Sequence, residues 1–378
     1  MADLDAEVAV VGAGVVGSAV SLALSRRGVS VVLLEAEPEP GLGASGTNSG
    51  ILHTGFDSVP GELETEMILR STALRYAVLE PLGVPVSRCG AVVRPADEAQ
   101  RKTVAALATT AERNGVEASL RADGSLEVPG EAVTDPVACT LALAAAAARH
   151  GAELRTTCRA TAVERRGRDF ELGLAGGEQV TCRVIVNCAG LRADEVARLV
   201  GDDSFEIYPR KGEFLVFDQP PSEPLERILL PVPTKRTKGV LVFPTIDGKV
   251  VAGPTAVDQE DKDDWSVRPE ARNAILPKAT AMYPPLADSD PIAAYAGLRP
   301  AGRRVNYVIA RSTVCDRLVN VAAIRSTGMT ASLGIAERVC ELLRDVGVRL
   351  GAAEPLKKGS PPARATQWWR RAAEHRKP

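Results

Sequence analysis

The stretch EVAVVGAGVVGSAVSLALSRRGVSVVLLE, residues 7–35, decides the fold. Residues 7–11 are a short apolar run typical of a buried parallel strand. They lead into the glycine turn GAGVVG, residues 12–17, and a helical pattern follows until Gly28 stops it. A second β-branched run, residues 29–34, ends on Glu35. This order of strand, glycine turn, helix, strand and acid predicts a Rossmann-type βαβ unit.

Each part of this unit has a physical role in holding a dinucleotide. Gly12 permits the tight turn, Gly14 lets the backbone approach a pyrophosphate, and Gly17 lets the helix pack closely on the strand. The start of the helix offers free N–H groups and partial positive charge to phosphates. Glu35 follows Gly14 by 21 residues, where a carboxylate can accept hydrogen bonds from a ribose. A lone GxGxxG also occurs in ordinary turns, but the complete unit favours a bound dinucleotide.

Two further features favour FAD over NAD. GLGASGTNSG, residues 41–50, is a run of small and hydroxyl residues that would lie along an extended cofactor and supply backbone donors. A solvent loop is the alternative interpretation. No second GxGxxG follows in the sequence, whereas a flavoenzyme that takes electrons from NADH would be expected to carry one. We therefore expect the substrate to react at the flavin itself.

Length and composition exclude several functional classes. The 378 residues are enough for two domains, and 45% apolar and 25% charged residues are ordinary for a globular protein. The net charge of −2 gives no reason to expect nucleic-acid binding. Seven cysteines without a CxxC pair and only three histidines argue against a disulfide framework, an iron–sulfur cluster or a metal site. Because no signal peptide or membrane-spanning run is recognisable, a cytoplasmic location is expected.

Beyond residue 60 the sequence alternates between helical and strand patterns. Residues 62–120 are mainly helical with a strand-like interruption at 90–94, and TDP at 134–136 begins an alanine-rich helix that ends at His150. Residues 207–256 are rich in strands and predict a largely antiparallel sheet suited to the floor of a substrate pocket. Further strands are expected at residues 153–155, 161–165, 170–174, 183–187 and 318–323.

Two strand ends are expected to approach the cofactor. CAGL, residues 188–191, follows one strand, and RSTGMT, residues 325–330, follows another and starts a helix through Leu343. The N-terminus of that helix would face an electron-rich flavin carbonyl. An ordinary helix cap is the alternative interpretation.

The C-terminal residues 357–378 are basic. Seven Lys and Arg residues stand against one Glu, and Trp368 and Trp369 are adjacent. Two interpretations are open: a solvated, flexible tail, or a segment that docks on an anionic membrane surface. The second would place the protein peripherally at the inner face of the membrane.

From residue 7 to about residue 343, the sequence resembles the FAD-dependent glycerol-3-phosphate dehydrogenase branch of the D-amino-acid-oxidase superfamily, close to the L-2-hydroxyglutarate dehydrogenases. The segments that carry the resemblance are GAGVVG (12–17), TNSGILHTGFD (47–57), YPRKGEFLVFD (208–218), PVPTKRTKGVLVFPTIDGKVVAGPTA (231–256) and AGLRP (296–300). Many flavoproteins share the nucleotide-binding segments, whereas KGVLVFPT followed by GPTA is selective for this group.

The resemblance implies an α/β fold, with a discontinuous Rossmann-like FAD-binding domain and a substrate domain that has a largely antiparallel β-sheet. The expected cofactor is FAD, and no metal is expected. The FAD-binding domain is expected to comprise residues 1–84, 134–205 and 293–350, and the substrate domain residues 85–133 and 206–292, followed by the basic tail 351–378.

The resemblance also implies which residues hold FAD. Gly12, Gly14, Gly17 and Glu35 would bind its adenosine and pyrophosphate end. The other residues expected to contact the cofactor are Ser45, Asn48, Ser49, Gly50, Val163, Ala189 and Gly190, with Gly328, Met329 and Thr330 near the flavin ring.

Two residues are expected to carry the chemistry. His53 lies in the segment expected beside the flavin, and its titration range suits a proton acceptor; a structural hydrogen bond is the alternative. Arg299 would present a bidentate fork to a substrate carboxylate or phosphate; a buried ion pair is the alternative. Lys211, Lys238 and Arg325 are further candidates for binding an anionic substrate, although surface charge is the commoner role of a single lysine.

The sequence departs from the family pattern at three places. Where the family has an acidic residue followed by Ser-Pro-Gly-Leu, this chain has Arg325 followed by Ser-Thr-Gly-Met, a charge reversal close to the flavin. The sequence also lacks the cysteine-rich iron–sulfur domain of longer relatives, so electrons are expected to leave through a quinone, oxygen or a partner protein. The Trp-Trp tail is not a family feature.

The expected function is oxidation of the secondary alcohol of a small anionic substrate, glycerol 3-phosphate first, by hydride transfer to flavin N5. L-2-hydroxyglutarate or another 2-hydroxy acid, or an amino acid or amine, are alternative substrates for the same fold. A non-catalytic FAD-binding module that assembles with a partner protein is an alternative from a different class.

Overall fold

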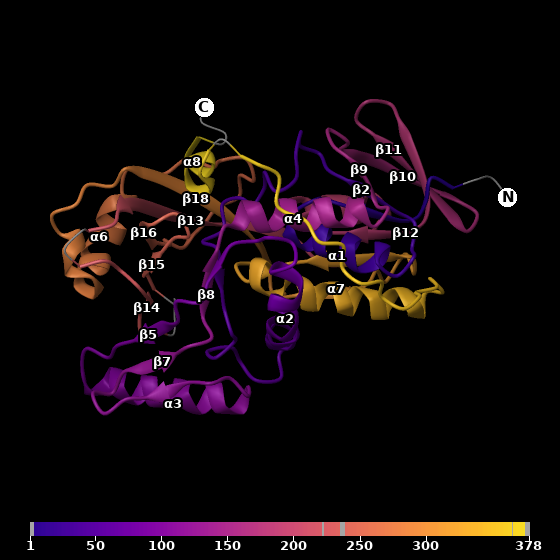
Figure 1. The fold of residues 1–378 in the computed structure, drawn as a ribbon. Helices are drawn as coiled ribbons and strands as arrows, with labels where there is room; N and C mark the ends of the chain where they lie inside the picture. Colours follow the sequence, from indigo (N-terminus) through magenta and orange to yellow (C-terminus); the bar gives the residue numbers. More distant parts are fainter. Residues whose placement is uncertain (1–3, 221–222, 235–238, 365, 375–378) are drawn as a thin grey trace.

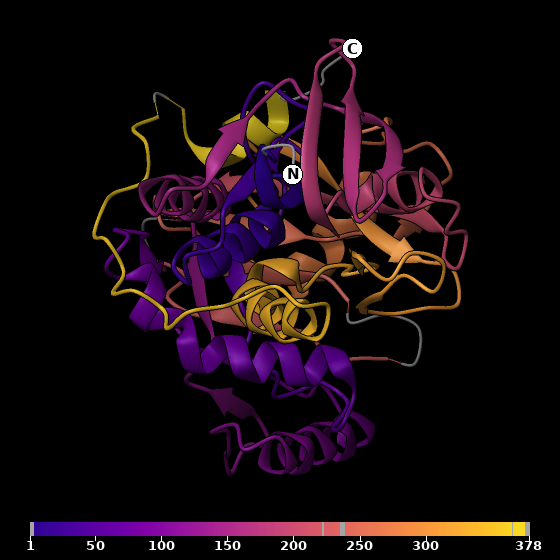
Figure 2. The same ribbon diagram turned by 90° about the vertical axis from the view of Figure 1, so that its right-hand side faces the viewer.

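Two large sheets and one small sheet form the framework of the molecule (Figure 1). The computed structural model describes residues 4–220, 223–234, 239–364 and 366–374. Within these residues one sheet has eight strands, another nine and the third three. Segments far apart in sequence contribute to each large sheet, as the mixed colours of neighbouring strands show in Figures 1 and 2.

The eight-stranded sheet has a parallel centre. β1 (Ala6–Val11) lies between β2 (Val31–Leu34) and β12 (Gln179–Asn187), while β9 (Glu153–Arg155) pairs with β2 and β20 (Leu318–Ala322) with β12, all in parallel. Because the carboxyl ends of parallel strands meet at one edge, the turns after these strands come together there. The antiparallel strands of this sheet are β10 (Ala160–Arg166), β11 (Asp169–Leu174) and β19 (Val308–Arg311).

Alternation along β1 explains how both faces of this sheet are covered. Val8 and Val10 pack with the helices on one face, and Ala9 and Val11 pack on the other face with residues of β11 and β12. The covering helices are α1 (Val15–Ser25), α4 (Pro136–Arg149) and α7 (Gly328–Asp345), stacked beside one another in Figure 1, with α2 (Leu63–Leu79) packed on α7. The short η1 (Gly190–Arg192) and α5 (Ala193–Arg198) follow β12.

The nine-stranded sheet is antiparallel except where β5 and β14 pair. Its longest strand, β13 (Ile207–Asp218), pairs along nearly its whole length with β18 (Ala293–Gly302). The other strands are β5 (Ala91–Val93), β6 (Ser119–Leu120), β7 (Leu126–Val128), β14 (Ile228–Leu230), β15 (Leu241–Pro244), β16 (Lys249–Gly253) and β17 (Val257–Asp258). Its helices are α3 (Glu98–Arg113), α6 (Ala271–Met282) and the short η2 (Pro284–Leu286).

The small sheet links the two large ones. It consists of β3 (Ile51–Leu52), β8 (Ala132–Thr134) and β4 (Val86–Ser87), with β8 in the middle. β3 comes from the glycine-rich segment after β2, whereas β8 leads from the nine-stranded sheet into α4. The residues that follow β3 therefore lie between the two large sheets.

The architecture confirms the expected α/β fold with a parallel sheet and a largely antiparallel one. The expected start of α4 is also confirmed, since the Asp135 side chain accepts hydrogen bonds from the N–H groups of Val137 and Ala138. The helices expected within residues 62–120 and the strand-like interruption at 90–94 correspond to α2, α3 and β5, while β4 is a further short strand that was not expected. Pro81 and Pro85 follow α2, and proline cannot continue a helix.

The C-terminal tail differs from both interpretations of its sequence. α8 (Trp368–Glu374) packs against the nine-stranded sheet, and Trp368 and Trp369 are only 2% and 1% exposed. The Trp369 Nε1–H donates to Asp247 Oδ2 (2.7 Å), and the Trp368 ring packs edge-on against Tyr295. The two tryptophans are therefore part of the core and are not available for a membrane surface.

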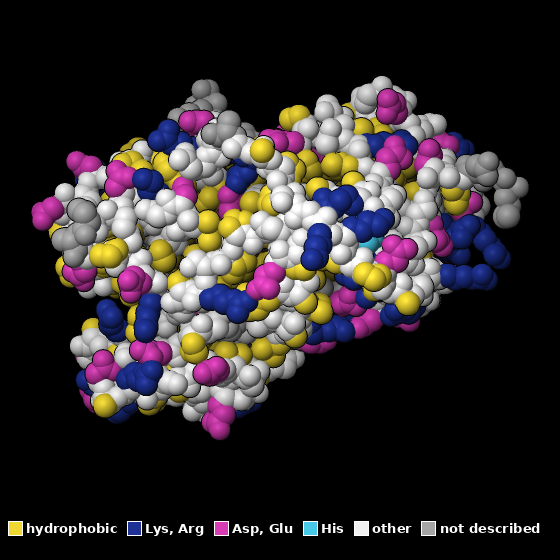
Figure 3. Space-filling view, viewed as in Figure 1, with side chains coloured by type: hydrophobic (Ala, Val, Ile, Leu, Met, Phe, Trp, Pro, Cys, Tyr) yellow, Lys and Arg dark blue, Asp and Glu magenta, His cyan; other side chains and the backbone are white. Residues whose placement is uncertain are grey.

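The surface charge is mixed. Basic and acidic side chains are interspersed over the face shown in Figure 3. Among the described residues, no helix combines the length and apolar character needed to cross a bilayer.

Candidate active site

The glycine turn after β1 leaves no room for side chains. Gly12 has a φ of +102°, and a Cβ there would lie 2.5 Å from the carbonyl oxygen of Cys188 at the end of β12. A Cβ on Gly17 would lie 1.9 Å from the Gly12 carbonyl oxygen. Both glycines are thus required by close backbone packing, which brings the start of α1 to the edge of the sheet.

Ser45 holds the glycine-rich segment against the start of α1. Its Oγ accepts a hydrogen bond from the Val15 N–H (2.9 Å), and the Gly41 N–H donates to the Ala13 carbonyl (3.1 Å). A Cβ on Gly14 would lie 3.0 Å from Ser45 Oγ, so this glycine allows the approach. Residues 41–50 are therefore a packed clamp over the turn, and the solvent-loop interpretation is wrong.

Glu35 faces the same turn from the end of β2. Its Oε2 accepts a hydrogen bond from the Ala13 N–H (2.7 Å) and its Oε1 one from the Glu37 N–H (3.0 Å). Burial raises the pKa of Glu35, and these two hydrogen bonds partly offset that effect. The carboxylate thus lies next to the glycine turn, as the motif predicts.

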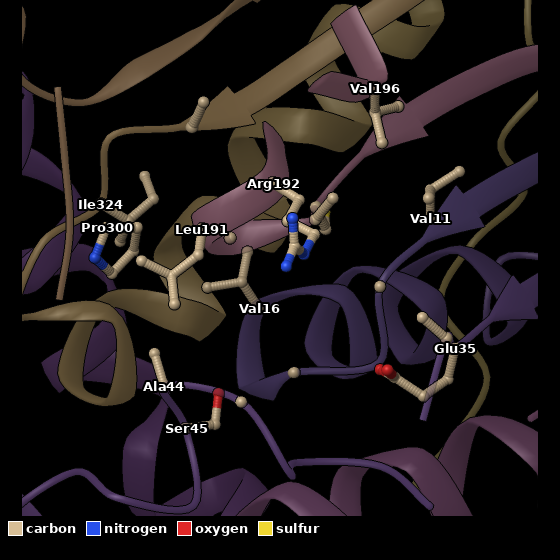
Figure 4. A pocket seen from close by; sticks show the side chains of 18 of the residues that line it. Val11, Val16, Glu35, Ala44, Ser45, Leu191, Arg192, Val196, Pro300 and Ile324 are labelled. Atoms are coloured by element: carbon tan, nitrogen blue, oxygen red, sulfur yellow. The ribbon is translucent and has the colours of Figure 1, made fainter. Parts of the chain in front are cut away.

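A groove of about 350 Å³ runs over these turns. Figure 4 shows Glu35 at one end and Pro300 and Ile324 at the other, with the start of α1 between them. The groove therefore follows the edge where the parallel strands end. The predicted cofactor residues that line it are Gly12, Gly14, Glu35, Ser45, Asn48, Ala189, Gly190, Gly328 and Met329.

Five predicted cofactor residues are not among those that line the groove: Gly17, Ser49, Gly50, Val163 and Thr330. Val163 packs instead against the core under β10 and β11, and Thr330 is buried under His53. Residues that the sequence reasoning missed are Cys158, Arg159 and Ala160, which follow β9. These residues could have been predicted from the position of β9 in the parallel sheet, because the carboxyl end of β9 also points to the groove.

A second cavity, of about 570 Å³, joins the groove. The two spaces share Ala44, Asn48 and Arg325. Phe214 of β13 and Phe243 of β15 contribute to its apolar wall, so the antiparallel sheet forms its floor as expected. Both predicted catalytic residues, His53 and Arg299, line this cavity, and so does Ser49.

His53 is held by contacts from three parts of the chain. Its N–H donates to Thr330 Oγ1 of α7 (3.0 Å), and its carbonyl accepts from the buried Arg75 of α2, which also donates to the Leu52 carbonyl (3.1 Å). Its ring Nδ1 lies 2.9 Å from Oε2 of Glu131. With Nδ1 engaged, Nε2 is the ring nitrogen left for a group in the cavity. The sequence reasoning did not identify Arg75 or Glu131.

Arg299 is anchored by carbonyl groups. Its Nε–H donates to the carbonyl of Arg210 (3.1 Å), and its Nη2 donates to those of Lys211 (3.0 Å) and Thr255 (2.7 Å). Burial lowers the pKa of Arg299 to about 10, which still leaves it charged at neutral pH. This geometry fits neither interpretation of Arg299 from the sequence: the guanidinium is not a free bidentate fork, and it is not held in a buried ion pair with any described residue. Nη1 is the nitrogen without a described carbonyl partner.

Arg325 stands at the junction of groove and cavity, paired with Glu64 of α2. Arg325 Nη2 donates to Glu64 Oε2 (2.8 Å), and Glu64 also accepts from Thr327 Oγ1 (2.8 Å) and Asn306 Nδ2 (2.9 Å). Burial raises the pKa of Glu64, but these hydrogen bonds outweigh burial and hold the pKa below its ordinary value. The basic residue is therefore balanced locally by a carboxylate.

The backbone before α7 is strained where it reaches the groove. Ala323 has a φ of +54° and Arg325 one of +51°, a conformation that costs free energy in residues with a side chain. The Thr327 side chain does not cap α7, because it donates to Glu64. The first N–H groups of α7, at Gly328 and Met329, thus lie at the groove without a side-chain cap.

Of the two lysines suggested for substrate binding, the described one does not support that role. Lys211 is 1% exposed and its Nζ donates to Asp264 Oδ2 (2.7 Å). It is not among the residues that line the cavity. Lys238 lies outside the described residues.

Cysteine and metal chemistry have little basis in the described residues. The seven cysteines are free thiols, and burial raises the pKa of Cys139 to about 12. No group of three or more His, Cys, Asp and Glu side chains is arranged there to hold a metal ion.

The groove, the clamp and the cavity define a dinucleotide-binding oxidoreductase, and comparison with known families agrees. The family model for FAD dependent oxidoreductases matches residues 7–342. The chain therefore belongs to this family of FAD-dependent enzymes.

The chain is also similar to individual known proteins. The chain is 28% identical over 364 residues to the glycerol 3-phosphate dehydrogenase of Caloramator mitchellensis, covering 92% of this chain and 76% of that protein. It is 26% identical over 277 residues to the mitochondrial L-2-hydroxyglutarate dehydrogenase of Mus musculus, covering 65% and 60%. Its fold matches the L-alpha-glycerophosphate oxidase of Mycoplasma pneumoniae with FAD bound (TM-score 0.87, 24% identity, 95% and 99% coverage).

Proposed function

We propose that this protein oxidises the secondary alcohol of a small anionic substrate, with glycerol 3-phosphate as the first candidate. One observation carries the proposal: His53 and Arg299 line a single cavity that joins the dinucleotide groove at Ala44, Asn48 and Arg325. A proton acceptor and a cation thus lie beside the end of the cofactor site. The activities named for the relatives from Caloramator mitchellensis and Mycoplasma pneumoniae support this substrate class.

The groove fits FAD in its chemistry. Gly12 and Gly14 allow the close packing that brings the start of α1 to the groove, where its N–H groups would face a pyrophosphate. Glu35 would accept hydrogen bonds from the adenosine ribose. At the other end, Gly328 and Met329 would present the N-terminus of α7 to the flavin ring. Bound FAD supplies the two-electron acceptor for the hydride that leaves the substrate carbon.

His53 would take the hydroxyl proton of the substrate. Its ring lines the cavity with a side chain that is 27% exposed, so a bound alcohol can reach it. An imidazole is well suited to accept a proton near neutral pH. Loss of this proton allows the carbon–oxygen double bond of the ketone to form as the hydride departs.

Arg299 would bind the anionic group of the substrate through Nη1. Three carbonyl groups already orient the guanidinium, so little side-chain entropy would be lost on binding. A buried cation also attracts an anion more strongly than an exposed one. Arg325 would contribute less, because Glu64 balances its charge.

The electron acceptor would be oxygen, a quinone or an electron-carrier protein. We retain a cytoplasmic location as part of the proposal; it suits oxygen or a carrier protein, whereas a quinone would require contact with the membrane surface. Membrane docking through the tail was suggested by its two tryptophans, and these are buried in α8.

Anaerobic flavin bleaching tests the proposal. The FAD-loaded protein is mixed with glycerol 3-phosphate, L-2-hydroxyglutarate, L-lactate or a few amino acids, and flavin absorbance is followed. Fast bleaching by glycerol 3-phosphate is expected. Bleaching only by a 2-hydroxy acid would identify a different substrate and leave the proposed mechanism unchanged. Bleaching only by an amino acid would contradict alcohol oxidation.

The alternative is a non-catalytic FAD-binding module. It predicts a protein that holds FAD but is reduced by no member of the panel, and that forms tight complexes with a partner protein. The cavity beside the groove disfavours this alternative, because a module that only holds FAD has no use for a histidine and an arginine there.

A further inference from the structure

Glu131 lies behind His53 as a fully buried acid. Its side chain is 0% exposed, and it reaches His53 from the turn between β7 and β8, 78 residues further along the chain. A buried carboxylate is costly unless every oxygen has hydrogen-bond partners. Its position therefore calls for an account of those partners.

The two oxygens of Glu131 have separate partners. Oε1 accepts hydrogen bonds from both the N–H (2.6 Å) and the hydroxyl (2.8 Å) of Thr54. Oε2 is thereby left for Nδ1 of His53, at 2.9 Å. Because Thr54 is the next residue after His53, both oxygens are aligned by the same short segment. The carboxylate cannot rotate without breaking two hydrogen bonds.

The Thr54 backbone N–H can only donate, so Oε1 of Glu131 acts as an acceptor. Burial lowers the pKa of the nearby Arg75, and the charge of Glu131 acts against that effect. Cys89 is a neutral neighbour, since burial raises the pKa of its thiol to about 11. If Oε2 is likewise an acceptor, Nδ1 of His53 at 2.9 Å is the donor and carries the proton.

We infer that Glu131 is the positioning residue of this site: it holds the proton on Nδ1 of His53 and so makes Nε2 the nitrogen that accepts the hydroxyl proton of the substrate. The inference rests on the proposed function. A neutral imidazole has one donor and one acceptor nitrogen, and the partner of one nitrogen decides the role of the other.

The proton and electron balance follows from this arrangement. The substrate O–H bond breaks and an N–H bond forms at Nε2, while the substrate C–H bond breaks and its hydride goes to bound FAD. The substrate is oxidised to a ketone and FAD is reduced. The imidazolium formed at His53 lies against the Glu131 carboxylate, which stabilises its positive charge.

Glu131→Gln is the decisive variant, because the structure dictates how the new amide must lie. The two donors of Thr54 require the amide oxygen, so the NH2 group must face His53. An NH2 group donates, and Nδ1 must then accept. The proton of the neutral ring moves to Nε2, where it blocks the proposed base.

Nitrogen-15 NMR of histidine-labelled, FAD-loaded protein reads this tautomer directly. The chain has only three histidines, so the His53 signals can be assigned by their loss in His53→Asn. We expect a proton on Nδ1 in the wild type and on Nε2 in Glu131→Gln. A wild-type ring with its proton on Nε2 would overturn the inference, whatever the variant does.

Flavin reduction gives the second readout. The rate at saturating substrate is expected to fall on the order of 10³-fold in Glu131→Gln, by analogy with other histidine–carboxylate pairs. The substrate concentration for half-maximal rate and the FAD content are expected to change little. Glu131→Asp restores a carboxylate and should recover part of the rate, which a merely structural role would not predict.

Glu127→Gln is the matched control. Glu127 lies on β7, just before the turn that holds Glu131, but it pairs with the exposed Arg121 and Arg227. This variant should keep both the wild-type tautomer and the wild-type rate. An unchanged reduction rate in Glu131→Gln contradicts the inference alone. Failure of every alcohol to bleach the wild type contradicts the proposed function, and the tautomer measurement still decides the role of Glu131.

Discussion

The groove and the cavity that meet at Arg325 are built in different ways. The groove depends on backbone packing, because glycines and helix starts at the ends of neighbouring parallel strands shape it. The cavity depends on side-chain pairs from distant segments: His53 and Glu131 are 78 residues apart, and Glu64 and Arg325 are 261 apart. Substitutions in the groove should therefore act through steric clashes, and substitutions in the cavity through the loss of particular hydrogen bonds. Variants of the groove should lose FAD, whereas variants of the cavity should keep FAD and lose the reaction.

Gly17→Ala should have the largest effect. The new Cβ would lie 1.9 Å from the Gly12 carbonyl, so α1 must move away from the turn. We expect loss of FAD and a destabilisation of several kcal/mol, as for other overpacked sites. FAD content after purification and denaturant unfolding measure the two effects. Gly176→Ala is the control, because a Cβ there meets nothing within 4 Å; equal behaviour of the two variants would contradict the steric account.

His53→Asn should affect the cavity alone. An amide can still donate to Glu131, so the buried acid keeps a partner while the base is lost. Flavin reduction should slow by about 10²–10⁴-fold, with FAD content unchanged. Stopped-flow reduction and the absorbance ratio of flavin to protein check this. Loss of FAD from this variant would contradict the proposed difference between the groove and the cavity.

Glu35→Gln should weaken FAD binding and change the pH dependence of stability. Because burial raises the folded pKa of Glu35, its contribution to stability is present below the unfolded value of about 4.5 and is lost as the pH rises through the folded value. The apoprotein should therefore lose stability relative to Glu35→Gln as the pH rises from 4 to 7. Unfolding of both apoproteins at several pH values tests the sign. FAD affinity should fall roughly tenfold, the cost of about one hydrogen bond.

Arg325→Gln should have the smallest effect. The Arg325 side chain is 45% exposed, and Glu64 keeps two other donors. The pair should contribute no more than about 1 kcal/mol to stability. We expect retained FAD and a change in substrate affinity below about tenfold. Titration of the reduction rate measures this change, and a loss of all reduction would show that Arg325 binds the substrate directly.

Local signals allowed the groove to be predicted from the sequence. The strand, turn and helix of the motif are adjacent, and the roles of Gly12, Gly17 and Glu35 depend on contacts that this order determines. Neighbouring parallel strands then bring residues 188–190 and 328–329 to the same edge. The same rule would have identified Cys158 and its neighbours after β9.

The partners of the cavity could not be predicted in this way. Nothing local to His53 identifies Glu131, because the pairing depends on β3 and β8 lying in one small sheet. Arg299 lines the cavity, but its carbonyl partners follow from the pairing of β13 with β18. The burial of the tail was not predicted, because its net charge favoured an exposed segment. Trp368, Trp369 and Ala372 nevertheless form an apolar face on α8.

The parallel sheet combines strands from three distant parts of the chain, and this has a consequence for synthesis of the protein. Val11 lies opposite Asn187, and Asn187 opposite Asn320, so the sheet is complete only when nearly the whole chain is available. Contacts between such distant residues form slowly, and exposed strand edges promote aggregation in the meantime. FAD binds only the assembled groove and so stabilises the folded chain by mass action. A shortage of the cofactor during expression should thus lower the yield of folded protein as well as its activity.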